Sequence, residues 1–337
     1  MPTTSPGGSR APEIVPLGSA PPASAIAYLS GGGMPEAVIR WKYFDADFNR
    51  GRERGFCAFA DGEMVGFIGM IPVTLKRREE VRHDHWMCDW SIGDPRRDKG
   101  LGGLLASKAL ETAGRAIAYG GTEAAKKRWR LKANAFDLDA GRVYRKHLRL
   151  GSCFGILQRR GLMPDNRLTR LAGKVRLHWP RGAGDAVIVK GVDPSTAALF
   201  RAGEEHWRAT YDQVDLHWQL ESCPEVEAWT SVAADAAVLF WRSTRSSDAW
   251  KLVPLGRPEA FRPCLIEAIR HILRAGGLSA MVQLSSADQA LIRCVRALGF
   301  GRTRTTHPIF FLGPGPEQAP ETLEGISFLA SDEGHRF

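Results

Sequence analysis

The sequence predicts an α/β (α+β) protein of two tandem modules, each a mixed, mostly antiparallel sheet flanked by helices. The 337 residues suit about two domains, at roughly 150 residues each. Between residues 33 and 160 the pattern is helix, three antiparallel strands, helix, strand, helix, strand, and a similar succession returns later. We therefore expect a disordered tail at 1–24, modules at 25–160 and 185–315, a linker at 161–184 and a C-terminal tail at 316–337.

The first module begins with a short helix within 34–44. Asp61-Gly62 between two apolar runs predicts a hairpin of strands 56–60 and 64–73, since this dipeptide favours tight turns. A third strand follows at 85–92. Leu101, Leu105 and Ala109, spaced by four, predict one apolar face of a helix over 101–118. A strand at 129–135, a helix at 137–147 and a strand at 148–157 complete the module.

The second module repeats this order. After a strand at 186–190 and a helix near 195–202, the apolar runs 228–232, 236–241 and 250–255 predict three strands. A strongly amphipathic helix is expected at 258–275, followed by a strand at 278–284, a helix at 287–298 and a strand at 305–312.

Composition excludes several classes. The net charge of +9 is spread along the chain, which favours small polyanionic ligands at least as much as nucleic acid, and we do not expect a nucleic-acid partner. Six separated cysteines form no metal or disulfide framework, so we expect reduced thiols in a cytoplasmic protein. No apolar run reaches 18 residues, and we expect neither a membrane partner nor a metal. A monomer and a homodimer both remain open.

The junction of strand 85–92 with helix 101–118 has the build of a phosphate cradle. Arg97-x-x-Gly100-x-Gly102 stands between them, with Arg96 and Lys99 adding charge. Glycines allow a backbone to approach an anion, and the free amides and dipole of a helix start favour negative charge. The spacing differs from the common nucleotide-binding loops. It predicts a pyrophosphate ligand.

Strand, Arg-x-x-Gly-x-Gly and helix together resemble the acyl-CoA-binding motif of the GNAT superfamily of N-acyltransferases, and the element order over 33–160 is similar to theirs. The resemblance implies acetyl-CoA or another acyl-CoA as co-substrate. It also implies that the strand before the cradle pairs with the pantetheine arm and polarises the thioester, and that the loop and helix start hold the pyrophosphate. On this basis the cofactor-binding residues are Trp90, Ser91, Ile92, Gly93, Arg96, Arg97, Asp98, Lys99, Gly100, Leu101, Gly102, Gly103, Leu104 and Asn134.

Three residues are candidates for proton transfer. Tyr144 occupies the place of the general-acid tyrosine of the family, although the usual glycine and phenylalanine do not follow it. Strand alternation puts Asp89 opposite Trp90 and Ile92, where its carboxylate could deprotonate an amine. His85 is an alternative base with a suitable ordinary pKa. A packed tyrosine and a merely hydrogen-bonded aspartate remain alternatives.

The corresponding junction of the second module lacks the motif, since residues 255–261 hold one glycine and a proline. We therefore expect a single acyl-CoA site, in the first module, and N-acyl transfer to a small-molecule amine such as an amino sugar, with or without a linked nucleotide. The alternatives are an aminoacyl-tRNA-dependent transferase on a duplicated scaffold, a protein acetyltransferase and a non-catalytic CoA-binding protein.

Overall fold

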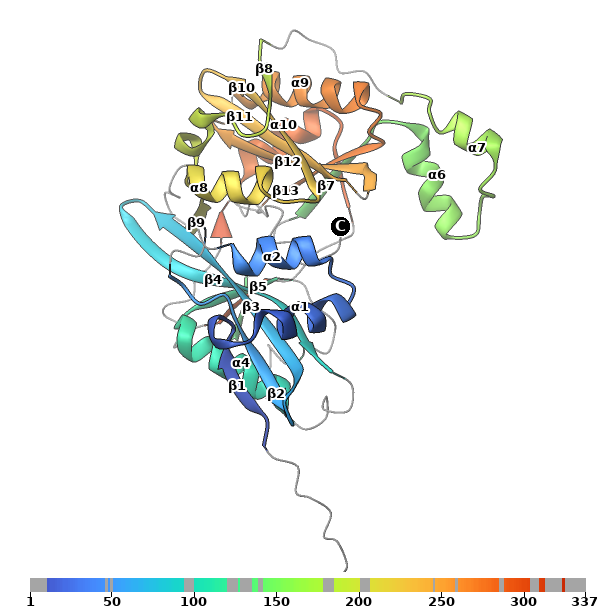
Figure 1. The fold of residues 1–337 in the computed structure, drawn as a ribbon. Helices are drawn as coiled ribbons and strands as arrows, with labels where there is room; N and C mark the ends of the chain where they lie inside the picture. Colours follow the sequence, from blue (N-terminus) through green and yellow to red (C-terminus); the bar gives the residue numbers. More distant parts are fainter. Residues whose placement is uncertain are drawn as a thin grey trace, which may run out of the picture. The chain divides into compact units, whose positions relative to one another are not determined.

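The computed structural model describes residues 11–45, 48, 51–93, 100–119, 127, 135–138, 142–177, 185–200, 207–244, 246–257, 260–284, 288–303, 309–312 and 323–324. They divide into two compact units (Figure 1). The first unit comprises residues 1–72, 84–136 and 310–319, and the second comprises 73–83, 137–309 and 320–337. Neither unit is one contiguous segment, which differs from the simple tandem boundaries that the sequence predicts.

The first unit is built on a mixed sheet with helices on both faces. Its strand order is β1-β2-β3-β4-β5-β15-β6. The strands are β1 (Glu13–Pro16), β2 (Gly55–Ala60), β3 (Glu63–Arg77), β4 (Glu80–Ile92), β5 (Ala116–Tyr119), β15 (Ile309–Leu312) and β6 (Ala135–Leu138), and the helices are α1 (Pro22–Gly31), α2 (Glu36–Phe44) and α4 (Leu101–Ala113). The predicted hairpin at Asp61-Gly62 is confirmed, and the far ends of β3 and β4 belong to the second unit.

The second unit carries a seven-stranded sheet in the order β14-β7-β13-β12-β11-β10-β8. Its strands are β14 (Gly301–Arg302), β7 (Arg142–His147), β13 (Ser279–Leu284), β12 (Ser246–Gly256), β11 (Ala236–Ser243), β10 (Val226–Ala233) and β8 (Val187–Lys190). The helices are α6 (Leu150–Arg159), α7 (Arg167–Ala172), α8 (Gln213–Leu216), α9 (Phe261–Arg274) and α10 (Gln289–Ala297). β9 (Trp207–Thr210) pairs with the end of β3 and with β16 (Leu323–Glu324).

The two sheets share one plan. In each, a parallel pair of strands is joined by a helix: β4 and β5 through α4, and β12 and β13 through α9. The next strand in each sheet comes from the other half of the sequence, β15 beside β5 and β7 beside β13. The two sheets thus resemble each other in this part of their strand order, and each takes one strand from the other half of the sequence.

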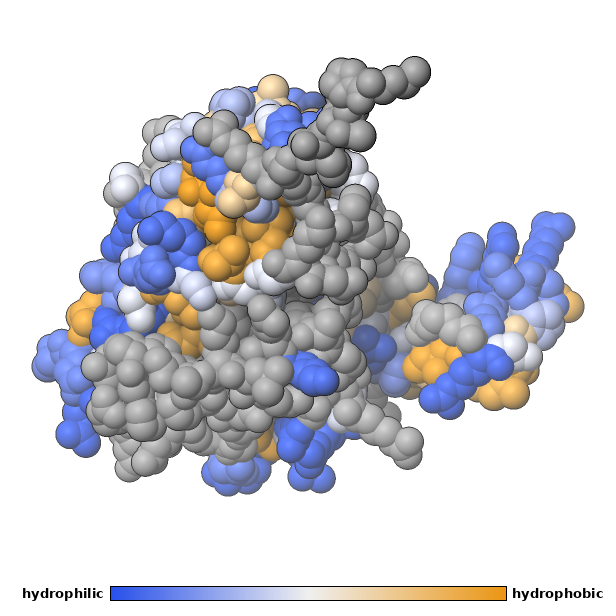
Figure 2. All heavy atoms as spheres, turned by 90° about the horizontal axis from the view of Figure 1, so that it is seen from below, coloured by the Kyte–Doolittle hydropathy of each residue, from blue (hydrophilic) through white to orange (hydrophobic). Residues whose placement is uncertain are grey.

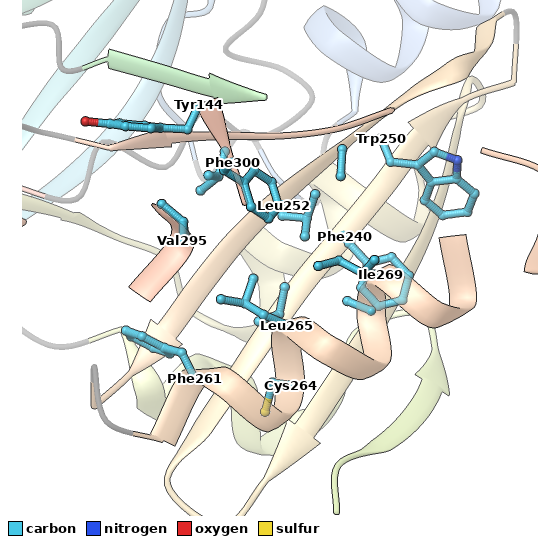
Figure 3. Packing of buried hydrophobic residues seen from close by; sticks show 14 of the residues in the cluster. Tyr144, Phe240, Trp250, Leu252, Phe261, Cys264, Leu265, Ile269, Val295 and Phe300 are labelled. Carbon is cyan, nitrogen blue, oxygen red and sulfur yellow. The ribbon is translucent and has the colours of Figure 1, made fainter. Parts of the chain in front are cut away.

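Each unit has its own apolar core. In the first, α4 packs Leu101, Leu105 and Ala109 on residues of β2, β3 and β5, as the spacing of four predicts. In the second, α9 covers β11, β12 and β13 with its apolar face (Figure 3). Burying such faces is the main stabilising contribution to a sheet with a helix on it.

Several sequence predictions are wrong. Residues 13–31 form β1 and α1 where a tail was expected up to residue 24, because β1 pairs with β2 and covers its edge. Residues 142–147 form β7 where a helix was expected, and 150–159 form α6 where a strand was expected. The assumed linker contains α7. In residues 142–147, Val143 and Arg145 alternate with more buried neighbours, a pattern that suits a strand as well as a helix. Pairing with β13 makes this segment a strand.

Candidate active site

The candidate site lies where β4 parts from β5. Their parallel register covers His85 to Met87 against Ala116 to Ala118, and within the described residues it ends there. β4 continues to Ile92, and the Gly93 N–H donates to the carbonyl oxygen of Val65 on β3 at 2.8 Å. One edge of β4 is therefore supported by β3 as far as Gly93, whereas pairing of the other edge with β5 is described only as far as Met87. A strand edge without a strand partner is where an extended ligand can pair with backbone groups.

β4 has a bulge at Asp89. Its φ is +51°, in the left-handed region that non-glycine residues rarely occupy. Met87 contributes to the core beneath α4, and so do Trp90 and Ile92, although 87 and 90 should face opposite sides of a regular strand. The extra residue shifts the alternation, as in a β-bulge. The face predicted for Asp89, opposite Trp90 and Ile92, is confirmed.

A buried ion pair holds the bulge in place. The Nζ of Lys42, on α2, lies 2.7 Å from Oδ2 of Asp89, and the two side chains are 1% and 9% exposed. The hydroxyl of Tyr43 donates to the same oxygen and also lies 3.5 Å from the Sγ of Cys88. Because Cys88 and Asp89 are consecutive yet both reach Tyr43, this contact depends on the bulge.

The surroundings are shaped for this tyrosine. Gly69 on β3 lies directly beneath it, and a Cβ at that glycine would overlap the Tyr43 hydroxyl. Burial, followed by the charge of Asp89, raises the pKa of Tyr43 well above its ordinary value, so it stays a donor. Burial likewise raises the pKa of Cys88 to about 12, which keeps this thiol protonated. Asp89 is thus fully engaged in holding β4, which differs from the free base that the sequence suggested.

Lys42 and Tyr43 contact Asp89 at the candidate site, and the sequence reasoning missed both. The spacing of Lys42 in the sequence could have indicated its burial. It follows Val38 by four residues and Ile39 by three, and the side chains of Val38 and Ile39 are fully buried. A lysine on the apolar stripe of a short helix requires a buried carboxylate, because an unpaired charge there is very costly.

The start of α4 forms the other wall. Gly100 precedes the helix with φ +77° and no side chain to cap it, and its carbonyl oxygen accepts from the amides of Gly103 and Leu104. The amides of Leu101 and Gly102 have no acceptor within the helix, by α-helical geometry. A Cβ at Gly102 would lie 3.2 Å from Cζ2 of Trp90, so this glycine also lets the helix approach β4 closely. An uncapped, glycine-lined helix start fits a phosphate.

Five of the predicted cofactor-binding residues lie outside the described residues: Arg96, Arg97, Asp98, Lys99 and Asn134. The structure brings together the others, Trp90 to Gly93 at the end of β4 and Gly100 to Leu104 at the start of α4. Ser91 and Leu104 are exposed, whereas Leu101 is buried in the core. For Leu101 only the backbone amide can serve a ligand.

His85 is a neutral imidazole. Burial is the main reason its pKa falls to about 4, and the charge of Arg52 lowers it further. Its Nδ1 is buried and has no hydrogen-bond partner among the described residues. Above that pH the ring is uncharged and can accept a proton, but only as a weak base.

Tyr144 lies elsewhere. It is on β7, opposite Val282 of β13, and is 5% exposed in the core of the second unit. Its hydroxyl points away from the other labelled side chains of that cluster (Figure 3). The helical position expected for a general acid is therefore wrong, because residues 142–147 join the second sheet.

The second unit has a small cavity at the matching place. The register of β12 with β13 ends at Leu252 opposite Val282, and a cavity of about 230 Å³ opens beyond it. Its lining includes Val253, Pro254, Gln283 and Phe261 at the start of α9. Among the described residues, no group of His, Cys, Asp or Glu side chains is placed to hold a metal ion, and no helix is long and apolar enough to cross a bilayer.

Comparison with known proteins agrees with the geometry. Residues 28–136 match the family model "Acetyltransferase (GNAT) family", a segment that includes β4, α4 and β5. No curated protein matches the chain.

Solved structures extend the similarity to most of the chain. The N-myristoyltransferase of Saccharomyces cerevisiae with bound myristoyl-CoA is 13% identical, with a TM-score of 0.55 over 88% of this chain and 81% of that one. A GCN5-related N-acetyltransferase from Kribbella flavida is 13% identical, with a TM-score of 0.54 over 89% and 71%. One from Anabaena variabilis is 10% identical, with a TM-score of 0.53 over 89% and 72%. Identities this low establish the fold. The family match covers residues 28–136, and the solved structures add a shared fold over most of the chain.

Proposed function

We propose that the protein transfers an acyl group from acyl-CoA to the primary amine of a small molecule, at the opening between β4 and β5. The observation that carries this proposal is the bulge at Asp89 of β4, beside an uncapped helix start. The same segment holds the family match. We infer one such site per chain.

The residues of the site have separate tasks. The backbone of Trp90 to Gly93 would pair with the pantetheine arm, and an N–H there would donate to the thioester oxygen as negative charge develops on it. The amides at the start of α4 would hold the pyrophosphate, with Arg96, Arg97 and Lys99 adding charge. Lys42 and Asp89 act by positioning β4.

The reaction needs no covalent enzyme intermediate. The neutral amine attacks the thioester carbonyl carbon, the C–N bond forms, the C–S bond breaks, and the thiolate takes up a proton. Because Asp89 is engaged with Lys42 and His85 is a weak base, the amine must arrive largely uncharged or lose its proton to water. The rate should therefore rise with pH toward the amine's own pKa, with no inflection near 6.5.

The acceptor is an amine of limited size in this proposal, and an amino sugar is the first class to test. N-myristoyltransferase is similar in fold over 88% of this chain and binds myristoyl-CoA in its solved structure. That likeness makes long-chain acyl donors a second class worth including.

A thiol-release assay tests the proposal. Acetyl-, octanoyl- and myristoyl-CoA would each be incubated with panels of amino sugars, polyamines and amino acids, while calorimetry measures binding of each donor alone. We expect one donor to bind in the micromolar range and to release thiol only with an amine present. Absence of binding for all donors would refute the site. Donor binding without thiol release for any amine would instead support a CoA-binding protein without catalytic activity.

A further inference from the structure

A helical arm of the second unit, residues 148–177, carries an unusual surface. It contains α6 and α7, which pack against each other away from the sheet (Figure 1). Among the described residues, nine large apolar side chains are exposed, and five of these lie on the arm. They are Leu162 at 70%, Leu168 at 76%, Leu171 at 53%, Val175 at 52% and Leu177 at 44%.

The arm is an ordered element with a firm base. The Leu150 amide donates to the carbonyl oxygen of Val175 at 3.0 Å, and the Leu177 amide donates to that of Leu148 at 2.9 Å. The Arg149 guanidinium donates to the carbonyl oxygen of Leu273 at the end of α9, at 2.8 Å. Its exposed leucines are therefore held outward by structure.

Hydrogen bonds also join α6 and α7 within the arm. The Gly151 amide donates to the carbonyl oxygen of Gly173, and a Cβ at Gly151 would lie 3.0 Å from that oxygen. Asn166 and Thr169 form a reciprocal capping box that starts α7. Such a cap stabilises the start of a short helix. The C-terminal end of α7 is thus joined to the start of α6, and its N-terminal end is capped.

The charge of the arm is strongly one-sided. Its sequence holds seven Lys and Arg and a single acidic residue, Asp165. Asp165 pairs with Arg170 at 2.8 Å. Arg160, Arg167, Lys174 and Arg176 are exposed beside the leucines. Figure 2 shows this mixture of apolar and strongly polar residues on the part of the molecule that projects to the right.

We propose that the arm binds the surface of an anionic lipid bilayer, with Leu162, Leu168 and Leu171 entering the interface and the basic side chains contacting lipid phosphates. Exposed leucines with adjacent arginine and lysine are the composition of interfacial helices, which need both signals for stable binding. A nucleic acid would bind the basic residues through its phosphates, but it would leave the exposed leucines without an apolar contact. The proposal goes beyond acyl transfer, and it departs from the expectation that no membrane is involved.

Flotation with lipid vesicles tests this inference on the full-length protein. The vesicles are phosphatidylcholine alone or phosphatidylcholine with an equal part of phosphatidylglycerol, at about 0.1 M and about 0.5 M NaCl. We expect at least about tenfold more bound protein with phosphatidylglycerol at low salt, and a large decrease at high salt.

Two arm variants and one control separate the contributions. Leu168→Ser with Leu171→Ser removes apolar contact, and Arg167→Glu with Lys174→Glu reverses charge. Each should reduce binding at least about fivefold with an unchanged Tm, because all four side chains are exposed. Val187→Ser with Val214→Ser, 64% and 47% exposed but outside the arm, should bind like the wild type.

Three results would overturn the proposal. The first is no preference for phosphatidylglycerol vesicles, or a preference that both arm variants retain. The second is a dimer in light scattering that the leucine variant dissociates, since the arm would then contact a second copy. The third is binding of poly(U) RNA that the charge variant loses and the leucine variant keeps.

Discussion

The junctions β4–α4 and β12–α9 occupy the same place in two sheets of the same plan, yet they differ in three respects. β4 has a bulge at Asp89, whereas β12 pairs regularly with β11 from Lys251 to Gly256. Eight residues, 93–100, join β4 to α4, and only four, 257–260, join β12 to α9. Pro254 stands in β12 and offers no N–H. We infer that the first junction binds a ligand and that the second, which holds only a small cavity, does not bind acyl-CoA.

The comparison of the two junctions shows that a few local features distinguish them. At the first junction a glycine with φ +77° precedes the helix, and no side chain of this N-cap residue caps the first amides. At the second, Phe261 begins the helix and is buried in the core. A longer loop, a glycine and a bulge held by one ion pair therefore separate the two. Substitutions can change these features one at a time.

The largest effect is expected from charge at the start of α4. Gly102→Glu and Leu104→Glu each place a carboxylate where the pyrophosphate should bind, so acyl-CoA affinity should fall at least about a hundredfold by calorimetry. Leu104 is 56% exposed, so its variant should keep the wild-type Tm even if Gly102→Glu disturbs Trp90.

The matched control sits at the other junction. Arg257 is exposed just before α9, and Arg257→Glu should leave affinity unchanged. If Arg257→Glu abolished binding and Leu104→Glu did not, the assignment of the two junctions would be reversed.

Breaking the ion pair beneath the bulge should have the next largest effect. Lys42→Met removes the cation that neutralises the buried Asp89 carboxylate, which should lower the free energy of unfolding by about 3–5 kcal/mol in urea titration. Turnover should fall with it, because β4 loses its support. Lys42→Met with Asp89→Leu should recover most of the stability without recovering turnover.

The exposed pair Lys108 and Glu111 provides the control. Their side chains lie 3.3 Å apart and are 50% and 65% exposed, so Lys108→Met should change stability by less than about 0.5 kcal/mol. A Lys42→Met protein with full turnover would show that the bulge does not need the pair.

Because of His85, the free energy of unfolding depends on pH in the acidic range. Its folded pKa of about 4 lies below the ordinary value of 6.5, so between these pH values the unfolded chain binds a proton that the folded chain does not. Stability therefore falls as pH decreases through this window. His85→Gln should lose about 2–3 kcal/mol less than the wild type between pH 6.5 and 4, since one pH unit corresponds to about 1.4 kcal/mol. Equal losses in urea titrations would contradict a buried neutral imidazole.

Sequence reasoning predicted the regular parts of this comparison and missed the tertiary ones. The hairpin at Asp61-Gly62 and the start of helix α4 follow from turn chemistry and local spacing, and both are confirmed. The predicted end of that helix at residue 118 is wrong, because α4 ends at Ala113 and Ala116–Tyr119 form β5. The exchange of β7 and β15 depends on which sheet edge is open, which local patterns do not encode. Tyr144 was misplaced for that reason. The pairing of Lys42 with Asp89 joins residues 47 apart and needs the bulge, itself a tertiary feature.

The smallest effect on binding and stability is expected from a substitution at Pro254, which tests the difference between the two junctions directly. Pro254→Ala restores an N–H to β12 at the cavity but adds neither a bulge nor a longer loop, so no acyl-CoA site should appear. Calorimetry should give one acyl-CoA bound per chain for wild type and variant alike, with unchanged turnover and a stability change within about 1 kcal/mol. Two molecules bound per wild-type chain would contradict the inference that the second junction is packed. A second molecule only in the variant would mean that the proline alone, and neither loop length nor bulge, closes that junction.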